Sequence, residues 1–136
     1  MSETTQFELV SPERLLLSEP VDMVVVPGAE GYFGVLARHQ PMISTLVPGV
    51  IEVHKDGRIS ERLFVGGGFA EVTEDRCTVL AEVAVAVDDI DAAEVGRRIA
   101  SIEEEIADAG SDDERAALKA RLAVAVAMRE TAAGRA

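Results

Sequence analysis

Few side chains of this protein have the chemistry of a catalytic or metal site. Its histidines are His39 and His54, and neither belongs to an H-x-x-x-H pair, a paired-cysteine motif or an Asp-rich calcium loop. His39 stands beside a Gln-Pro turn, without a nearby serine or cysteine nucleophile motif, so we expect a structural or interface histidine. Cys77 is the single cysteine and is expected in a strand, in a reducing compartment. The sequence therefore predicts no catalytic residue, no metal site and no cofactor.

Two clusters of glycine are the other candidates. Glycines recur at every third residue from Gly28 to Gly34, and three more occupy residues 66–68. Neither cluster has the spacing of a dinucleotide fingerprint or a P-loop, so phosphate binding is not predicted. For residues 66–68 we expect turn and bulge geometry in a twisted sheet. For the first cluster we favour partner contact, because Tyr32 and Phe33 place scarce aromatic side chains in a loop, with packing of Phe33 under its own loop as the alternative.

These residues are positioned by a series of short, β-branched segments separated by turns. Such regular spacing is typical of an all-β sandwich or barrel, which we assign to residues 1–87. Asp56-Gly57 predicts a two-residue hairpin turn, and Pro48-Gly49 predicts a turn between two further strands. The expected strands are residues 7–10, 15–17, 21–26, 33–36, 42–47, 50–54, 59–65, 69–72 and 77–87.

The spacing of apolar residues changes after Asp88 from that of strands to that of helices, and residues 88–136 predict an antiparallel two-helix hairpin. Asp91 is placed to cap a first helix whose apolar residues share one stripe, and Gly110 ends that helix. Ser111 begins a capping box for a second helix, after a connection of only a residue or two. Because the second helix offers mostly alanine to the packing, we expect a weakly held, mobile element. The first stripe consists of Val95, Ile99, Ile102 and Ile106.

Charge limits the partners of this protein. Its net charge of −12 opposes binding to nucleic acid or to anionic lipid. The N-terminus lacks the pattern of a secretory or transit peptide, and the longest apolar run, residues 122–128, is too short to span a bilayer. Membrane association is therefore expected only through partner proteins. Residues 88–114 are strongly acidic whereas residues 115–136 are basic, so the last helix could dock on its neighbour or on another acidic surface.

Two motifs carry a resemblance to a known family. The run P-G-x-E-G-x-x-G, followed by H-x-P and L-x-P-G, begins at Pro27, and G-G-F-x-E-V begins at Gly67. Both motifs, in this order, resemble the ε subunit of bacterial F-type ATP synthases, and the resemblance covers nearly the whole sequence. It implies a non-catalytic, central-stalk subunit that couples rotation of the c-ring to the catalytic head. It also implies a peripheral location on the cytoplasmic face of the bacterial inner membrane.

The resemblance assigns contact residues to three surfaces. It implies that Glu30, Gly31 and Tyr32 face the c-ring. It implies that Ser11, His39 and Ser44 face the γ subunit. It further implies that basic residues of the last helix meet the α/β catalytic head and block ATP hydrolysis, at Arg115, Lys119, Arg121 and Arg129.

The resemblance also bears on ATP binding. Some family members bind ATP through I-D-x-x-R-A, but here Glu94 stands where that motif has arginine, so ATP sensing is expected to be absent or weak. The alternative function is an acidic β-sandwich adaptor that binds another protein through residues 27–49. A sugar-modifying β-sandwich enzyme is a third hypothesis, weakened by the lack of a clustered His/Glu site.

Overall fold

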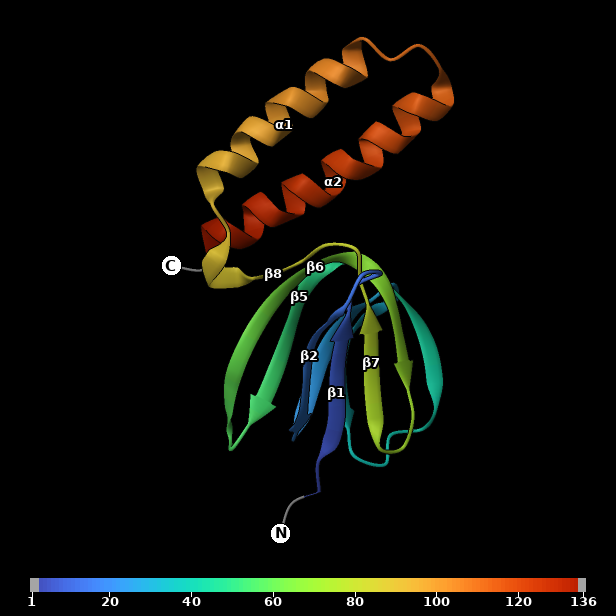
Figure 1. Cartoon of the computed structure of the whole chain (residues 1–136), viewed down its shortest axis with the longest axis vertical. Helices are drawn as coiled ribbons and strands as arrows, with labels where there is room; N and C mark the ends of the chain where they lie inside the picture. The colour runs from blue at the N-terminus through green and yellow to red at the C-terminus, as the bar shows by residue number, and fades with distance from the viewer. Residues whose placement is uncertain (1–2, 135–136) are drawn as a thin grey trace. The chain divides into compact units, whose positions relative to one another are not determined.

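Apolar residues alternate with polar ones along the first 86 residues, and in the computed structural model, which describes residues 3–134, these segments form eight strands. The protein divides into two compact units, Met1–Ala86 and Val87–Ala136 (Figure 1). The strands are β1 (Thr5–Val10), β2 (Leu15–Val21), β3 (Met23–Gly28), β4 (Gly31–Leu36), β5 (Met42–Lys55), β6 (Arg58–Val72), β7 (Arg76–Leu80) and β8 (Ala84–Ala86).

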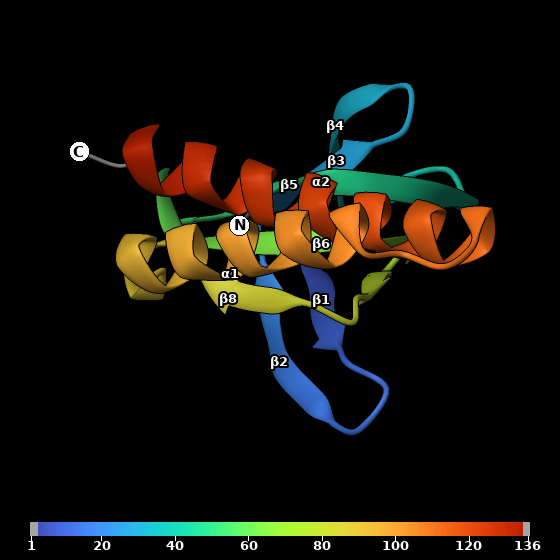
Figure 2. The same cartoon turned by 90° about the horizontal axis from the view of Figure 1, so that it is seen from above.

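The strands form one sheet that folds over into the two layers of a sandwich. The order along the sheet is β2-β1-β7-β6-β5-β3-β4, and β8 pairs with β6. The long strands β5 and β6 contribute to both layers. Residues 42–46 of β5 and 68–72 of β6 lie in one layer with β7, β1 and β2, whereas residues 48–55 and 58–66 lie in the other with β3, β4 and β8. The β3–β4 and β1–β2 hairpins extend to opposite sides of the sheet (Figure 2).

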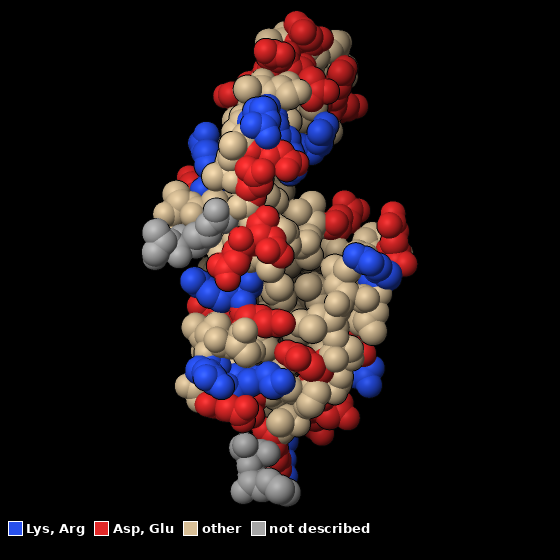
Figure 3. Space-filling model, turned by 60° about the vertical axis from the view of Figure 1, so that its left-hand side comes forward, with Lys and Arg blue, Asp and Glu red and all other residues tan. Residues whose placement is uncertain are grey.

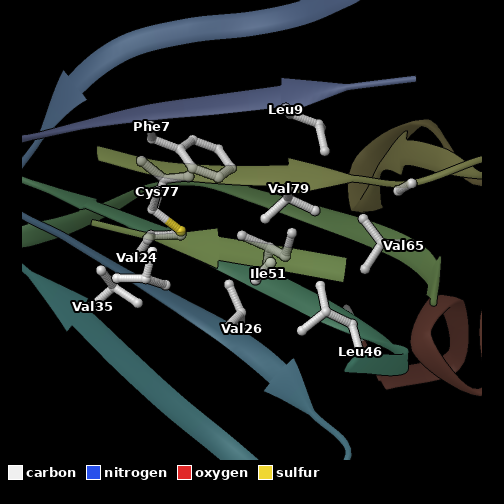
Figure 4. Close-up of a cluster of buried hydrophobic side chains, with 14 of the residues drawn as sticks. Phe7, Leu9, Val24, Val26, Val35, Leu46, Ile51, Val65, Cys77 and Val79 are labelled. Atoms are coloured by element: carbon white, nitrogen blue, oxygen red, sulfur yellow. The ribbon is translucent and has the colours of Figure 1, made fainter. Parts of the chain in front are cut away.

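The core of the sandwich lies between the layers and consists mainly of valine. Alternate residues of β1, β3, β6 and β7 point inward, as the period of two along a strand requires. Phe7, Val24, Ile51 and Val79 are completely buried (Figure 4). Cys77 belongs to this cluster, as expected of a strand residue. Shape-matched aliphatic side chains of this kind give a densely packed interior, which keeps the outer surfaces of the layers in fixed positions.

The two layers meet at a bend that only glycine permits. Gly68 has φ +136°, and a Cβ atom there would overlap the backbone carbonyl of Leu80. The opposite strand passes through this bend without interruption, since Pro48 pairs with Gly66 and Gly49 with Val65. The predicted turn at Pro48-Gly49 is therefore wrong, because these residues lie within β5, where the sheet folds over. The Asp56-Gly57 turn is confirmed, with φ of 55° and 79° at its two residues.

The second unit contains a short 3-10 helix, η1 (Val87–Asp89), and two α-helices, α1 (Ala92–Ala107) and α2 (Asp112–Gly134). Asp91 caps α1 through a bond from the Glu94 amide at 3.1 Å. Ser111 caps α2 by accepting the Glu114 amide at 3.1 Å, while the Glu114 carboxylate accepts the Gly110 amide at 3.1 Å. Both predicted caps are confirmed. The connection spans residues 108–111 and is longer than predicted.

Packing between α1 and α2 uses few large side chains. The buried residues of α1 are Val95, Ile99 and Ile102, all from the predicted stripe. The buried positions of α2 include two alanines, and α2 has only a weak apolar face. Small side chains bury little apolar area, so each alanine contributes less to the stability of the helix pair than a leucine would. The buried residues of α2 are Leu118, Ala125, Met128 and Ala132.

Candidate protein-contact surfaces

The tip of the β3–β4 hairpin, residues 29–31, is exposed at the end of the layer that contains β3, β4 and β8. Pairing of Gly28 with Gly31 leaves Ala29 and Glu30 as the turn, and Gly31 adopts φ +128°. The Ala29 amide donates to the Thr45 carbonyl of β5 at 2.9 Å. The Glu30 side chain is exposed and, within residues 3–134, forms no hydrogen bond or ion pair. The tip therefore presents a free carboxylate on a tethered backbone.

The two aromatic residues next to this tip have different roles. Tyr32 is 59% exposed, and its hydroxyl accepts the backbone amide of Val50 at 3.1 Å. Phe33 is partly buried against the sandwich core, with its ring centroid 6.4 Å from that of His39. The packing alternative for Phe33 is thus the one the structure supports. Of the residues predicted at the tip, Glu30, Gly31 and Tyr32 do lie together and exposed.

The residues assigned to a second surface are spread over one layer. Ser11 lies in the β1–β2 turn, where its amide donates to the Arg14 carbonyl at 2.9 Å. His39 lies in the loop between β4 and β5, where the neighbouring Arg38 amide donates to the Glu74 carbonyl at 2.6 Å, at the end of the layer where β1 begins. Ser44 lies on β5 opposite the buried Ala70 and shares its inward face. The structure therefore places Ser11 and His39 at opposite ends of the layer, and Ser44 at its edge.

The outward side of the same layer carries exposed apolar side chains to which the sequence analysis assigned no contact. We call Ile43, Phe69 and Leu80 the outer face; their exposed fractions are 72%, 54% and 49%. Phe69 and Leu80 are direct partners across β6 and β7. Beside them is a hollow of about 380 Å³, lined by Val10, Pro12, Gly66, Gly67, Gly68, Phe69, Leu80, Ala81 and Glu82. The sequence did hold one indication of this face. Phe69 and Ala70 are neighbours in a strand, so their side chains point to opposite sides of the sheet and one of the two must face outward.

The four basic residues of α2 differ in their surroundings. Arg115 donates to Asp112 at 2.8 Å and to the Ala109 carbonyl at 3.4 Å, so it fastens the connection between the helices. Lys119, Arg121 and Arg129 are exposed and make no ion pair within the described residues. At about 100° per residue, Arg115, Lys119 and Arg129 share a sector of about 80°, while Arg121 lies outside it. Acidic side chains gather at the end of the unit where α1 meets α2 (Figure 3).

Few titratable groups are perturbed. Burial, followed by the nearby Glu19, raises the pKa of Glu61, while Lys55 opposes this shift. Burial raises the pKa of the Cys77 thiol to about 12, so the thiolate that reacts or binds metal does not form near neutral pH. Among residues 3–134, no three His, Cys, Asp or Glu side chains are placed to hold a metal ion.

Comparison with known proteins agrees with this architecture, unit by unit. The β-sandwich domain of the ATP synthase delta/epsilon chain family matches residues 4–87, and the C-terminal domain of the ATP synthase epsilon chain family matches residues 91–136. This protein belongs to the ATP synthase epsilon chain family. The epsilon chain of Rhodospirillum rubrum is 51% identical over 128 residues, covering 94% of this sequence and 96% of that protein. The epsilon chain of Rhodospirillum centenum is 55% identical over 127 residues, covering 90% of this sequence and 87% of that protein.

Solved structures share the fold of this epsilon chain. One polypeptide of the Euglena gracilis mitochondrial ATP synthase OSCP/F1/c-ring structure matches with a TM-score of 0.73 and 23% identity, covering 96% of this sequence and 81% of that one. One polypeptide of the Tetrahymena thermophila mitochondrial ATP synthase central stalk/c-ring structure matches with a TM-score of 0.64 and 10% identity, covering 96% and 98%.

Membership of this family gives the epsilon chain its place in a larger assembly. It is a subunit of the F-type ATP synthase, a membrane-associated complex. No helix in residues 3–134 is long and apolar enough to cross a membrane. The predicted β-sandwich followed by two helices is confirmed.

Proposed function

We propose that this epsilon chain is a non-catalytic rotor subunit whose sandwich links the γ subunit to the c-ring, on the cytoplasmic face of the bacterial inner membrane. The outer face carries this proposal, because exposed apolar side chains on a rigid strand layer are typical of a protein interface. Torque passes through such a subunit only if the surfaces that meet its partners keep their relative positions. A sandwich with a closely packed valine core meets that requirement.

The γ subunit is the partner we assign to the outer face. Buried aromatic and aliphatic side chains dominate the energy of protein interfaces, and complete burial of one such side chain contributes about 1.5–3 kcal/mol. Ser11 and His39 mark the two ends of this layer, separated by about the length of a six-residue strand, or roughly 20 Å. A standard interface of about 800 Å² per partner spans both ends. Ser44 then contacts γ from the rim.

The c-ring is the partner we assign to the β3–β4 tip. Glu30 and Gly31 are both exposed there, and the Glu30 carboxylate is free for an external partner. The tip and the β1–β2 turn lie at opposite sides of the sheet (Figure 2). One sandwich can therefore hold two different partners at once.

The helical unit is assigned a regulatory contact with the α/β catalytic head. Lys119 and Arg129 share one exposed sector of α2 and lack acidic partners within the described residues, so they are available to an acidic surface. Arg115 would first have to leave Asp112 and the Ala109 carbonyl. We therefore expect Lys119 and Arg129 to contribute most to any inhibition of ATP hydrolysis, with Arg121 acting from another face.

ATP is not assigned to the helical unit. Glu94 forms an ion pair with Arg98 at 3.1 Å in the first turns of α1, where the ATP-binding motif has arginine. A carboxylate at this position repels phosphate. Calorimetry with millimolar ATP should give no saturable heat, whereas a sub-millimolar dissociation constant would overturn this assignment.

The γ assignment is tested by placing charge on the outer face. Phe69→Asp and Leu80→Asp should each weaken binding of the full-length protein to purified γ at least about 100-fold, since a desolvated carboxylate would have to enter the interface. Ile59→Asp is the matched control, because Ile59 is 43% exposed near the Asp56-Gly57 turn. Affinities for γ that remain native in both outer-face variants would reject this surface as the γ contact.

A further inference from the structure

The pairing of β3 with β5 is interrupted next to the tip. Val25 pairs with Glu52, and the next pairing beyond the interruption is Gly28 with Leu46, so β5 uses more residues than β3 over the same stretch. Extra residues in a bulge lose their regular ladder partners. Val50 lies in this stretch, and its amide donates to the Tyr32 hydroxyl at 3.1 Å. A side chain of β4 thus reaches over β3 to satisfy a backbone group of β5.

The backbone beneath the tyrosine is shaped to admit it. A Cβ atom at Gly49 would lie 2.6 Å from the Tyr32 hydroxyl oxygen and 2.8 Å from Cβ of Pro27. Any other residue at this position would therefore push the tyrosine away from the Val50 amide. The phenol rests directly on the bare backbone of β5, although the residue as a whole is 59% exposed.

A second tether holds the other side of the tip. The Ala29 amide donates to the Thr45 carbonyl at 2.9 Å, so β5 is bound to the tip before the interruption and again at Val50 within it. Glu30 and Gly31 lie between Ala29 and Tyr32 in sequence, and thus between the two tethers. Without the Tyr32 bond, the tip would be held to β5 on the Ala29 side alone, by this hydrogen bond and the neighbouring pairing of Gly28 with Leu46, and its other side could pivot.

We infer that Tyr32 is a positioning residue, which locks the β3–β4 tip onto the bend of β5 and so fixes the direction in which Glu30 is presented. This role differs from direct contact, because the tyrosine acts through its hydroxyl toward its own sheet. The functional consequence rests on the proposed c-ring contact. A rigid tip would transmit rotation of the c-ring directly to the sandwich, whereas a tip that pivots would move before the sandwich does.

The test uses the full-length protein with Tyr32→Phe, which keeps the ring and removes only the oxygen. Hydrogen exchange at the Val50 amide should accelerate about fivefold to tenfold, the effect of one net hydrogen bond. Ser60→Ala is the matched control, since it removes another side-chain bond to β5, from Ser60 to the Val53 carbonyl at 3.3 Å. Gly49→Ala should reproduce the Tyr32→Phe result by displacing the ring. Unchanged Val50 exchange in both Tyr32→Phe and Gly49→Ala would overturn the tether.

A spin label reports the tip itself. Glu30→Cys can be labelled selectively, because Cys77 is buried and its pKa of about 12 keeps it unreactive. The nitroxide spectrum should be immobilised with Tyr32 and gain a mobile component with Tyr32→Phe, and identical spectra would contradict the positioning role. In the assembled synthase, the yield of crosslinks from Glu30→Cys to the c subunit should fall with Tyr32→Phe. Crosslinks missing in both backgrounds would reject the c-ring assignment, while the exchange and spin-label results would still decide the tether.

Discussion

The sandwich and the helical unit bury apolar residues in different ways. The sandwich encloses its core between two strand layers, with Phe7, Val24 and Val79 fully buried. The helical unit relies on one stripe of α1 and on a face of α2 in which two of the four buried residues are alanine. Buried apolar area is the main stabilising contribution in both. From this difference we expect a rigid sandwich, which carries the surfaces proposed for γ and the c-ring, and a helical hairpin that opens at a low cost in free energy.

The largest effect is expected from the sandwich core. Phe7→Ala should lower the free energy of unfolding of the sandwich by about 3–5 kcal/mol, because it leaves a cavity among residues that cannot close around it. Chemical denaturation of the full-length protein measures this loss. Affinity for γ should fall at the same time, since the outer face depends on the core beneath it. A loss below about 1 kcal/mol would mean that the sandwich is not a rigid platform.

The bend between the layers should be the next most sensitive position. Gly68→Ala places a side chain at φ +136° and against the Leu80 carbonyl, so we expect a loss of about 1–3 kcal/mol or more. Gly96→Ala is the control, because a Cβ there meets nothing within 4 Å and alanine favours the helix by about 1 kcal/mol. Denaturation curves should thus move in opposite directions. Equal shifts would contradict the role assigned to the bend.

The helical unit should respond to its caps without affecting the sandwich. Ser111→Ala removes the bond to the Glu114 amide and should destabilise α2 by about 1 kcal/mol. Hydrogen exchange should become faster in α1 and α2 and stay unchanged in the strands. Ser101→Ala, at an exposed position within α1, should have the opposite or no effect. Faster exchange throughout the sandwich would show that the two units unfold together.

Much of this architecture could be predicted from local sequence. The Asp56-Gly57 turn and the caps at Asp91 and Ser111 depend on neighbouring residues alone. The passage of β5 through Pro48-Gly49 could not be predicted, because it depends on pairing with residues 65 and 66 of a distant strand. The same holds for Tyr32, whose hydroxyl partner is 18 residues away. The assignment of Ser11 and His39 to one surface came from the family resemblance and stays a prediction, and their places at opposite ends of one layer follow only from the fold.

The smallest effect is expected from a single carboxyl group. Because the pKa of Glu61 is raised by burial, its protonated form is favoured in the folded sandwich, and this stabilisation is lost as the pH rises through the raised value. Glu61→Gln should therefore stabilise the sandwich at pH 7 by less than about 1 kcal/mol, since the group is partly solvated, and should make little difference below about pH 4.

The control for this change is Glu52→Gln. The Glu52 carboxylate oxygens lie 3.4 Å from His54 Nε2 and 3.9 Å from Arg62 Nε, so removing the charge of Glu52 should not stabilise the sandwich. Urea denaturation at about pH 4 and at about pH 7 separates the two cases. If Glu61→Gln raised the free energy of unfolding equally at both pH values, the desolvated carboxyl group would be rejected as the source of the effect.

Removal of residues 89–136 is the most direct test of the separation between platform and helices. The truncated subunit should still bind γ, and synthase that contains it should still synthesise ATP from a proton gradient. Both are expected because the outer face and the β3–β4 tip belong to the sandwich. If Lys119 and Arg129 inhibit the catalytic head, ATP hydrolysis should rise in the same preparation. A truncated subunit that does not fold, or that folds and leaves the synthase uncoupled, would contradict this separation.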